Sequence, residues 1–135
     1  MKILSWNVNG LRAIERKWHI SDIYPLDMDL IFMQEIKAKS DQLSEELLHP
    51  APYKAIYHTA EKAWYSGVGL WIHERIASQV ISVDHDLPDN PVENEWRIIH
   101  TILNLDIGIT HIYGIYFPNG GKSEEAWQHK LAFYE

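Results

Sequence analysis

Two short apolar strands near the start of the chain each lead into a polar side chain, and this pattern constrains the fold more than any other feature. The first strand covers residues 2–7, is expected to be buried and ends in Asn7. The second is a continuous apolar run over 29–34 that is followed by Glu35. Apolar residues at helical spacing predict a helix over 11–18 between them. Strand, helix and strand in this order predict a βαβ unit with parallel, adjacent strands. We therefore expect both polar side chains at the same edge of a buried sheet, where open α/β sheets gather their ligands.

The rest of the chain predicts a mixed α/β domain with one sheet and flanking helices. A short helix is expected to begin at Ser40 or Asp41, and another after Ser123, because these residue types cap helices. The apolar residues of the second helix, Trp127, Leu131 and Tyr134, share one face. Further strands are expected over residues 53–58, 68–72, 76–83, 96–103 and 107–117, the last two forming a hairpin.

Composition narrows the class of protein. The 135 residues suffice for one domain, and an apolar fraction of 46% allows a packed core. A net charge of −7 argues against nucleic-acid binding through a general positive field, so a polyanion would have to meet local donors and metal cations. The absence of cysteine excludes disulfides, zinc thiolates and a thiol nucleophile. Without a signal peptide or an apolar run of the ~20 residues that span a membrane, we expect a soluble cytoplasmic protein with no membrane partner.

Several polar residues at strand ends are candidates for chemistry. Taken alone, Glu35 could be a solvated residue and Asn7 a turn former. Taken together at one sheet edge, they offer the oxygen ligands that Mg²⁺ prefers. Tyr116 ends the longest predicted strand, where its phenol could meet a phosphate or donate a proton. Asn119 lies in the Pro-Asn-Gly-Gly segment that follows, which is also an ordinary turn sequence.

Five short segments, taken in order, form a set that resembles a known family. They are 5–13 (Ser-Trp-Asn-Val-Asn-Gly-Leu-Arg-Ala), 33–37 (Met-Gln-Glu-Ile-Lys), 65–69 (Tyr-Ser-Gly-Val-Gly), 95–97 (Glu-Trp-Arg) and 116–120 (Tyr-Phe-Pro-Asn-Gly). On these residues the chain resembles exodeoxyribonuclease III and the related apurinic/apyrimidinic (AP) endonucleases of the endonuclease/exonuclease/phosphatase superfamily. The resemblance extends along essentially the whole chain. One departure is Trp96, which stands where relatives often have Gly.

The resemblance implies a role for each matching residue. Glu35 corresponds to the metal-binding glutamate, Asn7 to the asparagine that helps to hold the metal or the active-site network, and Tyr116 to the active-site tyrosine. These three would form the catalytic set, with Mg²⁺ as cofactor and Mn²⁺ as the alternative. Lys122 falls near a position where some relatives insert a cation into DNA. Substrate-binding or site-supporting roles are implied for Asn119, Arg12, Lys37, Tyr65 and Arg97.

The resemblance also implies a substrate and a fold. The partner would be double-stranded DNA with abasic sites or 3′ ends, cut 5′ to the abasic site and trimmed by 3′–5′ exonuclease action. The fold would be half of a four-layer α/β sandwich, with residues 1–135 as the amino-terminal half of the domain. Family members are longer, and their second half carries the group that activates water, further metal contacts and a phosphate-binding His. We therefore expect little or no nuclease activity from this chain alone, and an uncovered sheet face through which it could associate.

Two alternative functions remain open at the level of sequence. One is a non-catalytic half-domain that binds DNA or a protein partner, which the missing catalytic residues support. The other is a phosphodiesterase of the same fold that acts on inositol phosphates or lipids. The segments around Asn7 and Tyr116 favour the DNA-repair branch.

Overall fold

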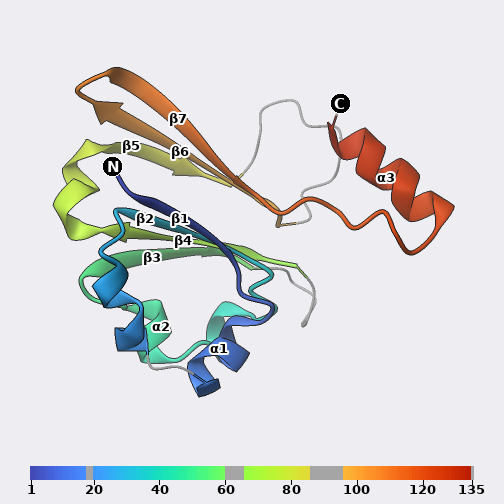
Figure 1. Cartoon of the computed structure of the whole chain (residues 1–135), viewed down its shortest axis with the longest axis horizontal. Coiled ribbons are helices and arrows are strands. Elements are labelled where there is room, and N and C mark those ends of the chain that lie inside the picture. Colours follow the sequence, from blue (N-terminus) through green and yellow to red (C-terminus); the bar gives the residue numbers. More distant parts are fainter. Residues whose placement is uncertain (18–19, 60–65, 86–95, 135) are drawn as a thin grey trace.

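Two β-sheets pack face to face in the computed structural model, which describes residues 1–17, 20–59, 66–85 and 96–134 (Figure 1). The first sheet has the strand order β1-β2-β4-β3, and the second has the order β5-β6-β7. The first sheet comprises β1 (Ile3–Asn7), β2 (Leu30–Gln34), β3 (Tyr53–His58) and β4 (Val68–His73). The second comprises β5 (Val80–Asp84), β6 (Ile98–Leu105) and β7 (Gly108–Ile115).

Helices flank the first sheet and follow the second. The α-helices are α1 (Leu11–Lys17), α2 (Glu45–Leu48) and α3 (Glu124–Tyr134). Short 3-10 turns cover Ile20–Asp22, Tyr24–Leu26, Ser40–Gln42 and Glu74–Gln79. The mixed α/β class is thus confirmed. No helix in the described ranges is long and apolar enough to cross a membrane.

The predicted parallel pairing of the first two strands is confirmed. β1 runs parallel to β2, with Asn7 opposite Gln34. The prediction that the first strand is buried is wrong, because β1 lies at the edge of its sheet. Its side chains alternate accordingly: Ile3 and Ser5 are exposed, whereas Leu4 is half-buried against the helix side of the sheet.

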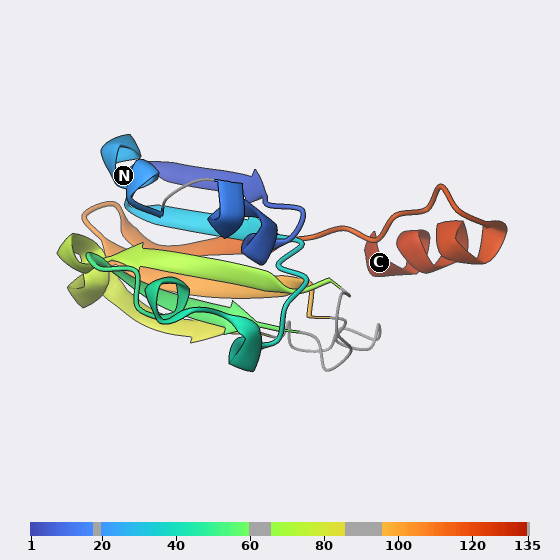
Figure 2. The same cartoon turned by 90° about the horizontal axis from the view of Figure 1, so that it is seen from below.

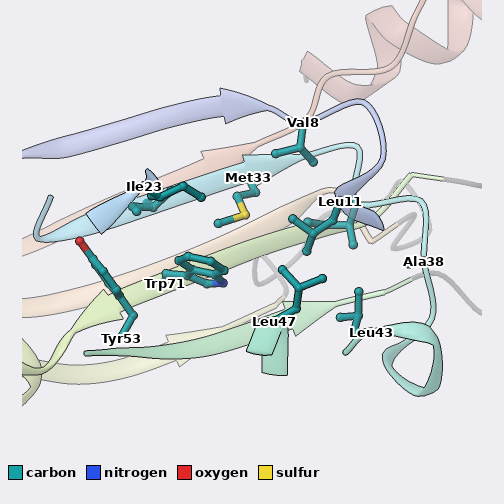
Figure 3. Close-up of a cluster of buried hydrophobic side chains, with 11 residues drawn as sticks. Val8, Leu11, Ile23, Met33, Ala38, Leu43, Leu47, Tyr53 and Trp71 are labelled. Atoms are coloured by element: carbon teal, nitrogen blue, oxygen red, sulfur yellow. The ribbon is translucent and has the colours of Figure 1, made fainter. Parts of the chain in front are cut away.

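The continuous apolar run of β2 is explained by burial on both faces of the first sheet. Ile31 and Met33 point to the helices and join a cluster with Leu11, Leu47 and Trp71 (Figure 3). The alternate residues of β2 belong to a second cluster between the two sheets, which contains Leu30, Phe32, Leu70, Ile99 and Leu103. A strand that packs on both faces needs apolar residues at every position, as its sequence indicated.

The prediction of an uncovered face on the first sheet is therefore wrong for most of that face. The hairpin of β6 and β7 does not extend that sheet; it builds a second sheet with β5 and covers the first one. At the edge of the first sheet the face stays open, because Ile3 of β1 is 46% exposed and lines a hollow with Phe32 and Ile112. Further exposed apolar side chains lie on the strands of the second sheet, at Ile81, Ile109 and Tyr113. An association through a wholly bare inner face therefore loses its basis, and among the described residues the uncovered part of that face lies at the β1 edge.

The strand expected over 76–83 is partly wrong, because its first half is helical. Residues Glu74–Gln79 form a 3-10 turn, and β5 begins only at Val80. The turn is stabilised at its start, where the backbone N–H of Arg75 donates to Nδ1 of His73 at 3.1 Å. Ile76 is buried within this turn. An apolar residue at this position therefore reflects burial and not a strand.

The last helix extends beyond the carboxyl end of β7, away from the two sheets (Figure 2). Its start is capped as predicted: Oγ of Ser123 accepts a hydrogen bond from the backbone N–H of Ala126 at 3.2 Å. The helix returns along the segment that precedes it, since the Phe117 ring contacts the rings of Phe133 and Tyr134 at centroid distances of 5.8 and 5.2 Å. None of its described residues is fully buried.

Candidate active site

The ends of β1 and β2 are joined through their following loops by backbone hydrogen bonds. The N–H of Gly10 donates to the carbonyl of Glu35 at 2.7 Å, and the N–H of Leu11 donates to that of Ile36 at 3.0 Å. The residues just before β4 bind the loop after β2 as well, because the N–H of Lys37 donates to the carbonyl of Ser66 at 3.0 Å. Three segments that are distant in sequence thus meet at one edge of the first sheet.

The backbone at this edge adopts left-handed conformations at residues other than glycine. Asn9, Glu35, Lys37 and Ser66 have φ angles of 46°, 57°, 52° and 44°. Asparagine tolerates such a conformation, but for most other residues besides glycine it costs about 1–3 kcal/mol and persists only where the surroundings impose it. Here the backbone bonds between the loops impose it. The Glu35 side chain is therefore aimed by the fold and not by local preference.

Glu35 is held by an asparagine from the neighbouring strand. Nδ2 of Asn7 donates to Oε1 of Glu35 at 2.8 Å, and Oδ1 of Asn7 accepts from the backbone N–H of Asn9 at 3.0 Å. The two side chains emerge side by side, as the parallel βαβ unit predicted. With both ends of its amide engaged, Asn7 fixes the orientation of the carboxylate.

Two further groups bind the same carboxylate. Nζ of Lys37 lies 2.6 Å from Oε2 of Glu35, and the Tyr116 hydroxyl also donates to Glu35. Burial by itself would raise the pKa of Glu35, but the hydrogen bonds from its three donors outweigh burial and hold that pKa below its usual value. The pKa of Tyr116 is raised, first by burial and then by its bond to the carboxylate. Glu35 is consequently anionic and the phenol protonated at neutral pH.

Arg97 connects the site to the second sheet. Its side chain is buried, and its Cζ lies 4.9 Å from the centroid of the Tyr116 ring. The backbone N–H of Tyr116 donates to the carbonyl of Arg97 at 2.8 Å. A guanidinium against an aromatic face is attracted by the ring electrons. Arg97 therefore supports the tyrosine that reaches across to Glu35.

A cavity of about 520 Å³ opens beside these residues. Glu35 and Lys37 line it from the first sheet, Arg97 and Tyr116 from the second, and Lys122 from the segment that leads into α3. Among the described residues that line it, Glu35 is the only carboxylate, against three cationic side chains. The cavity is therefore locally positive in a chain of net charge −7. Such a local field suits a phosphate group.

Most of the residues expected from the sequence meet here. Asn119 also lines the cavity, and its Oδ1 accepts from the backbone N–H of Gly121 at 2.9 Å. Arg12 does not line it; Arg12 lies at a smaller hollow of about 100 Å³ that Asn9 and Lys37 share. Tyr65 falls outside the described residues.

Other residues of the cavity were not singled out by the sequence. Ser66, Ala126 and His129 line it together with the predicted residues. Ser66 lies in the 65–69 segment that carries the family resemblance, and that segment could have pointed to it. His129 carries no such signal, because the spacing of α3 draws attention to its apolar residues and not to the opposite face.

The residues present fit a hard divalent cation only in part. Mg²⁺ takes oxygen ligands, often one or two carboxylates together with water and substrate phosphate. Glu35 can supply one carboxylate, whereas Asn7 turns a donor and not an acceptor towards it. No group of three His, Cys, Asp or Glu side chains within the described parts of the chain could hold a metal. A cation at Glu35 would therefore depend on water and phosphate for its other ligands.

The two-sheet architecture places the chain in a class of α/β sandwiches with solved structures. The AP endonuclease from Archaeoglobus fulgidus superimposes with a TM-score of 0.73 and 24% identity, over 97% of this chain and 47% of that one. The catalytic domain of Xenopus laevis APE2 gives a TM-score of 0.76 and 25% identity, over 99% of this chain and 51% of that one.

The sequence relatives define the family. The model of the Endonuclease/Exonuclease/phosphatase family matches residues 4–129, and the chain belongs to this family. It is 29% identical over 136 residues to an exodeoxyribonuclease of Bacillus subtilis (strain 168), and 30% identical over 120 residues to exodeoxyribonuclease III of Haemophilus influenzae. The match covers 100% and 89% of this chain, respectively. The chain spans 50% of the length of the first relative and 42% of the second.

Proposed function

We propose that this chain forms the metal-binding part of a DNA-repair phosphodiesterase, of the kind that cuts 5′ to abasic sites and trims 3′ ends with Mg²⁺ or Mn²⁺. The observation that carries the proposal is Glu35, an anionic carboxylate held by three donors at the rim of a cavity with cationic walls. A hydrolase that acts on phosphodiesters needs this pair of features: an oxygen ligand for a cation and positive groups for the phosphate.

The residues of the cavity, together with Asn7, which does not line it but binds Glu35, have separate roles. Asn7 and Lys37 keep the carboxylate of Glu35 ionised and oriented. Lys37 and Arg97 attract the phosphodiester, and Asn119 contacts one of its oxygens. A divalent cation bound at Glu35 would withdraw charge from the phosphoryl oxygens and the leaving oxygen. The protonated phenol of Tyr116 would donate a hydrogen bond to the phosphate or to the leaving group.

The choice of DNA as substrate rests on relatives and on charge. The sequence relatives bear the names exodeoxyribonuclease and exodeoxyribonuclease III. With a net charge of −7, the chain would hold a polyanion through this local cavity and a cation, and not through its whole surface.

A second function, DNA binding without cleavage by this chain alone, has one observation in its favour. Among the described residues that line the cavity, no second carboxylate is present to activate water or to complete a metal site. Removing one member of a catalytic unit commonly costs orders of magnitude in rate. The chain by itself would then bind abasic DNA and turn it over slowly or not at all.

A cleavage assay can test both functions together. The purified chain is incubated with Mg²⁺ and a labelled duplex that contains one abasic site, and a chimera that joins this chain to the unmatched half of the Bacillus subtilis relative is tested alongside it. We expect cleavage 5′ to the abasic site by the chimera and little or none by the chain alone.

The matched control is the Glu35→Gln variant of the same chimera, which keeps the shape of the side chain and loses its charge. We expect this variant to cleave at least about 100-fold more slowly. A folded chimera without activity would contradict the nuclease function. Rapid turnover by the 135-residue chain alone would contradict the idea that its active site is incomplete.

A further inference from the structure

One side of the cavity is formed by α3, which no motif of the sequence connects with chemistry. Ala126 and His129 of this helix line the cavity together with Glu35 and Tyr116. Their spacing of three residues places them on the same helical face. Trp127 and Leu131 lie on another face of the helix, because they do not line the cavity and are substantially exposed. The helix thus presents one small and one imidazole side chain to the cavity.

The position of α3 is fixed by contacts with the segment that follows Tyr116. Apart from the Phe117 ring contacts, a Cβ atom added to Gly120 would lie 2.8 Å from Cε3 of Trp127 and 3.1 Å from Cδ of Lys130. Gly120 is therefore needed for the close approach between this segment and the helix. Because the segment begins at the active-site tyrosine, the placement of His129 is tied to the placement of Tyr116.

The cavity is larger than one phosphate group requires. A volume of about 520 Å³ lies within the range of about 300–1,000 Å³ that is typical of whole ligands. Glu35 and Tyr116 stand on the side of the sheets, whereas Lys122 and His129 come from α3 and its approach. A nucleic-acid backbone that places one phosphate near Glu35 would thus bring another part of its backbone to α3.

We infer that His129 is a substrate-binding residue that donates a ring N–H to a phosphate of the DNA backbone other than the one that is cut. This inference rests on the proposed function, because it assumes that the cavity holds a DNA backbone. The chemistry suits the residue: an imidazole always carries at least one N–H donor, and phosphate oxygens accept. Ala126, one turn earlier on the same face, leaves space for the sugar-phosphate chain.

The test is equilibrium binding in EDTA, so that neither cleavage nor a metal contributes. The probe is a fluorescent duplex with one tetrahydrofuran abasic analogue, made as a series in which a neutral methylphosphonate replaces one phosphate at a time. The proteins are the full chain, His129→Ala, His129→Gln, and His49→Gln as the matched control. His49 lies at the end of α2 with its side chain 76% exposed, and it does not line the cavity.

We expect His129→Ala to bind the unmodified duplex about 5- to 10-fold more weakly, as the loss of one hydrogen bond to a charged group implies. His129→Gln should bind with intermediate strength, because its amide keeps a donor. When the methylphosphonate replaces the phosphate that His129 contacts, the affinity of the wild-type chain should fall by the same factor. The affinity of His129→Ala should not fall further on that duplex, because the contact is already missing. His49→Gln should bind like the wild type throughout. Thermal melting of each variant checks that α3 and the sheets remain folded.

Two results would overturn the inference while the proposed function stands. One is wild-type affinity in His129→Ala. The other is an equal loss on every duplex of the series, which would indicate a general structural effect and not a contact with one phosphate. If the wild-type chain binds none of the duplexes, either in EDTA or in a repeat of the series with Mg²⁺ in its place, the proposed function and the inference fail together.

Discussion

Asn7 and Glu35, 28 positions apart in the sequence, are joined by a hydrogen bond of 2.8 Å between Nδ2 and Oε1. Parallel pairing of their strands brings them to one sheet edge, and the backbone bonds between the following loops hold them there. The bond lets a carboxylate remain ionised while it is partly buried. A cation can be attracted to Glu35 only because this charge is maintained.

The donors around Glu35 should therefore control its titration. We expect Asn7→Ala and Lys37→Met each to raise the pKa of Glu35, because each variant removes a group that stabilises the charged form. The measurement is the carboxyl carbon chemical shift of Glu35 as a function of pH. Lys54→Met, an exposed change on β3, is the control and should leave the pKa of Glu35 where it is. Unchanged titration in both test variants would contradict the role given to these donors.

A second acidic residue, at the opposite end of β1, gives a pH dependence of stability. Asp27 accepts hydrogen bonds from Lys2 and Arg75, which lower the pKa of its carboxyl from 3.8 to about 2. A group whose pKa is lower in the folded state contributes stability above its unfolded pKa, and this contribution disappears as the pH falls through the folded value. The relevant window therefore lies between about pH 4 and pH 2.

Asp27→Asn tests this window without disturbing the backbone, because Asn tolerates the left-handed φ of 50° at this position. We expect the variant to melt at a lower temperature than the wild type at pH 7, with a difference that shrinks steadily as the pH falls towards 2 and disappears below it. The difference should be small and should shrink at high salt, since the carboxylate is exposed. Calorimetry over a pH series measures it. A difference that persists unchanged at pH 2 would contradict the assignment.

The sequence predicted those features that depend on neighbours along one strand or on one rule of topology. The apolar run of β2 indicated burial on both faces, and the βαβ order placed Asn7 beside Glu35. The sequence could not predict that the hairpin of β6 and β7 forms a second sheet. Alternation of apolar and polar residues along a strand reveals an apolar face, but not the surface against which that face packs. The same limit hid His129, since its place at the cavity depends on how α3 returns towards Tyr116.

The contact between the two sheets gives a prediction at Gly114. A Cβ atom at this position of β7 would overlap the ring of Phe32 on β2. We expect Gly114→Ala to destabilise the protein by about 1–3 kcal/mol, because an extra methyl group in a packed core forces its neighbours to shift. Urea unfolding measures the change. Adding Phe32→Leu should restore part of the loss, and a destabilisation that the second change cannot relieve would contradict the contact.

The last prediction concerns a buried chain of hydrogen bonds beneath α2. Nε1 of Trp71 donates to the Tyr57 hydroxyl at 2.8 Å, and this hydroxyl donates to the carbonyl of Leu47 at 2.7 Å. Tyr57→Phe removes both bonds and leaves the indole N–H and the carbonyl without these partners. We expect a loss of about 1–3 kcal/mol in the free energy of unfolding, the cost of stranding buried polar groups.

Tyr113→Phe is the matched control for this change, because that tyrosine is 46% exposed on the second sheet. It should unfold at the same urea concentration as the wild type. A double variant, Tyr57→Phe with Trp71→Phe, removes the stranded donor and should be less destabilised than the sum of the single changes. Strict additivity of the two changes would mean that the indole and the phenol are not coupled.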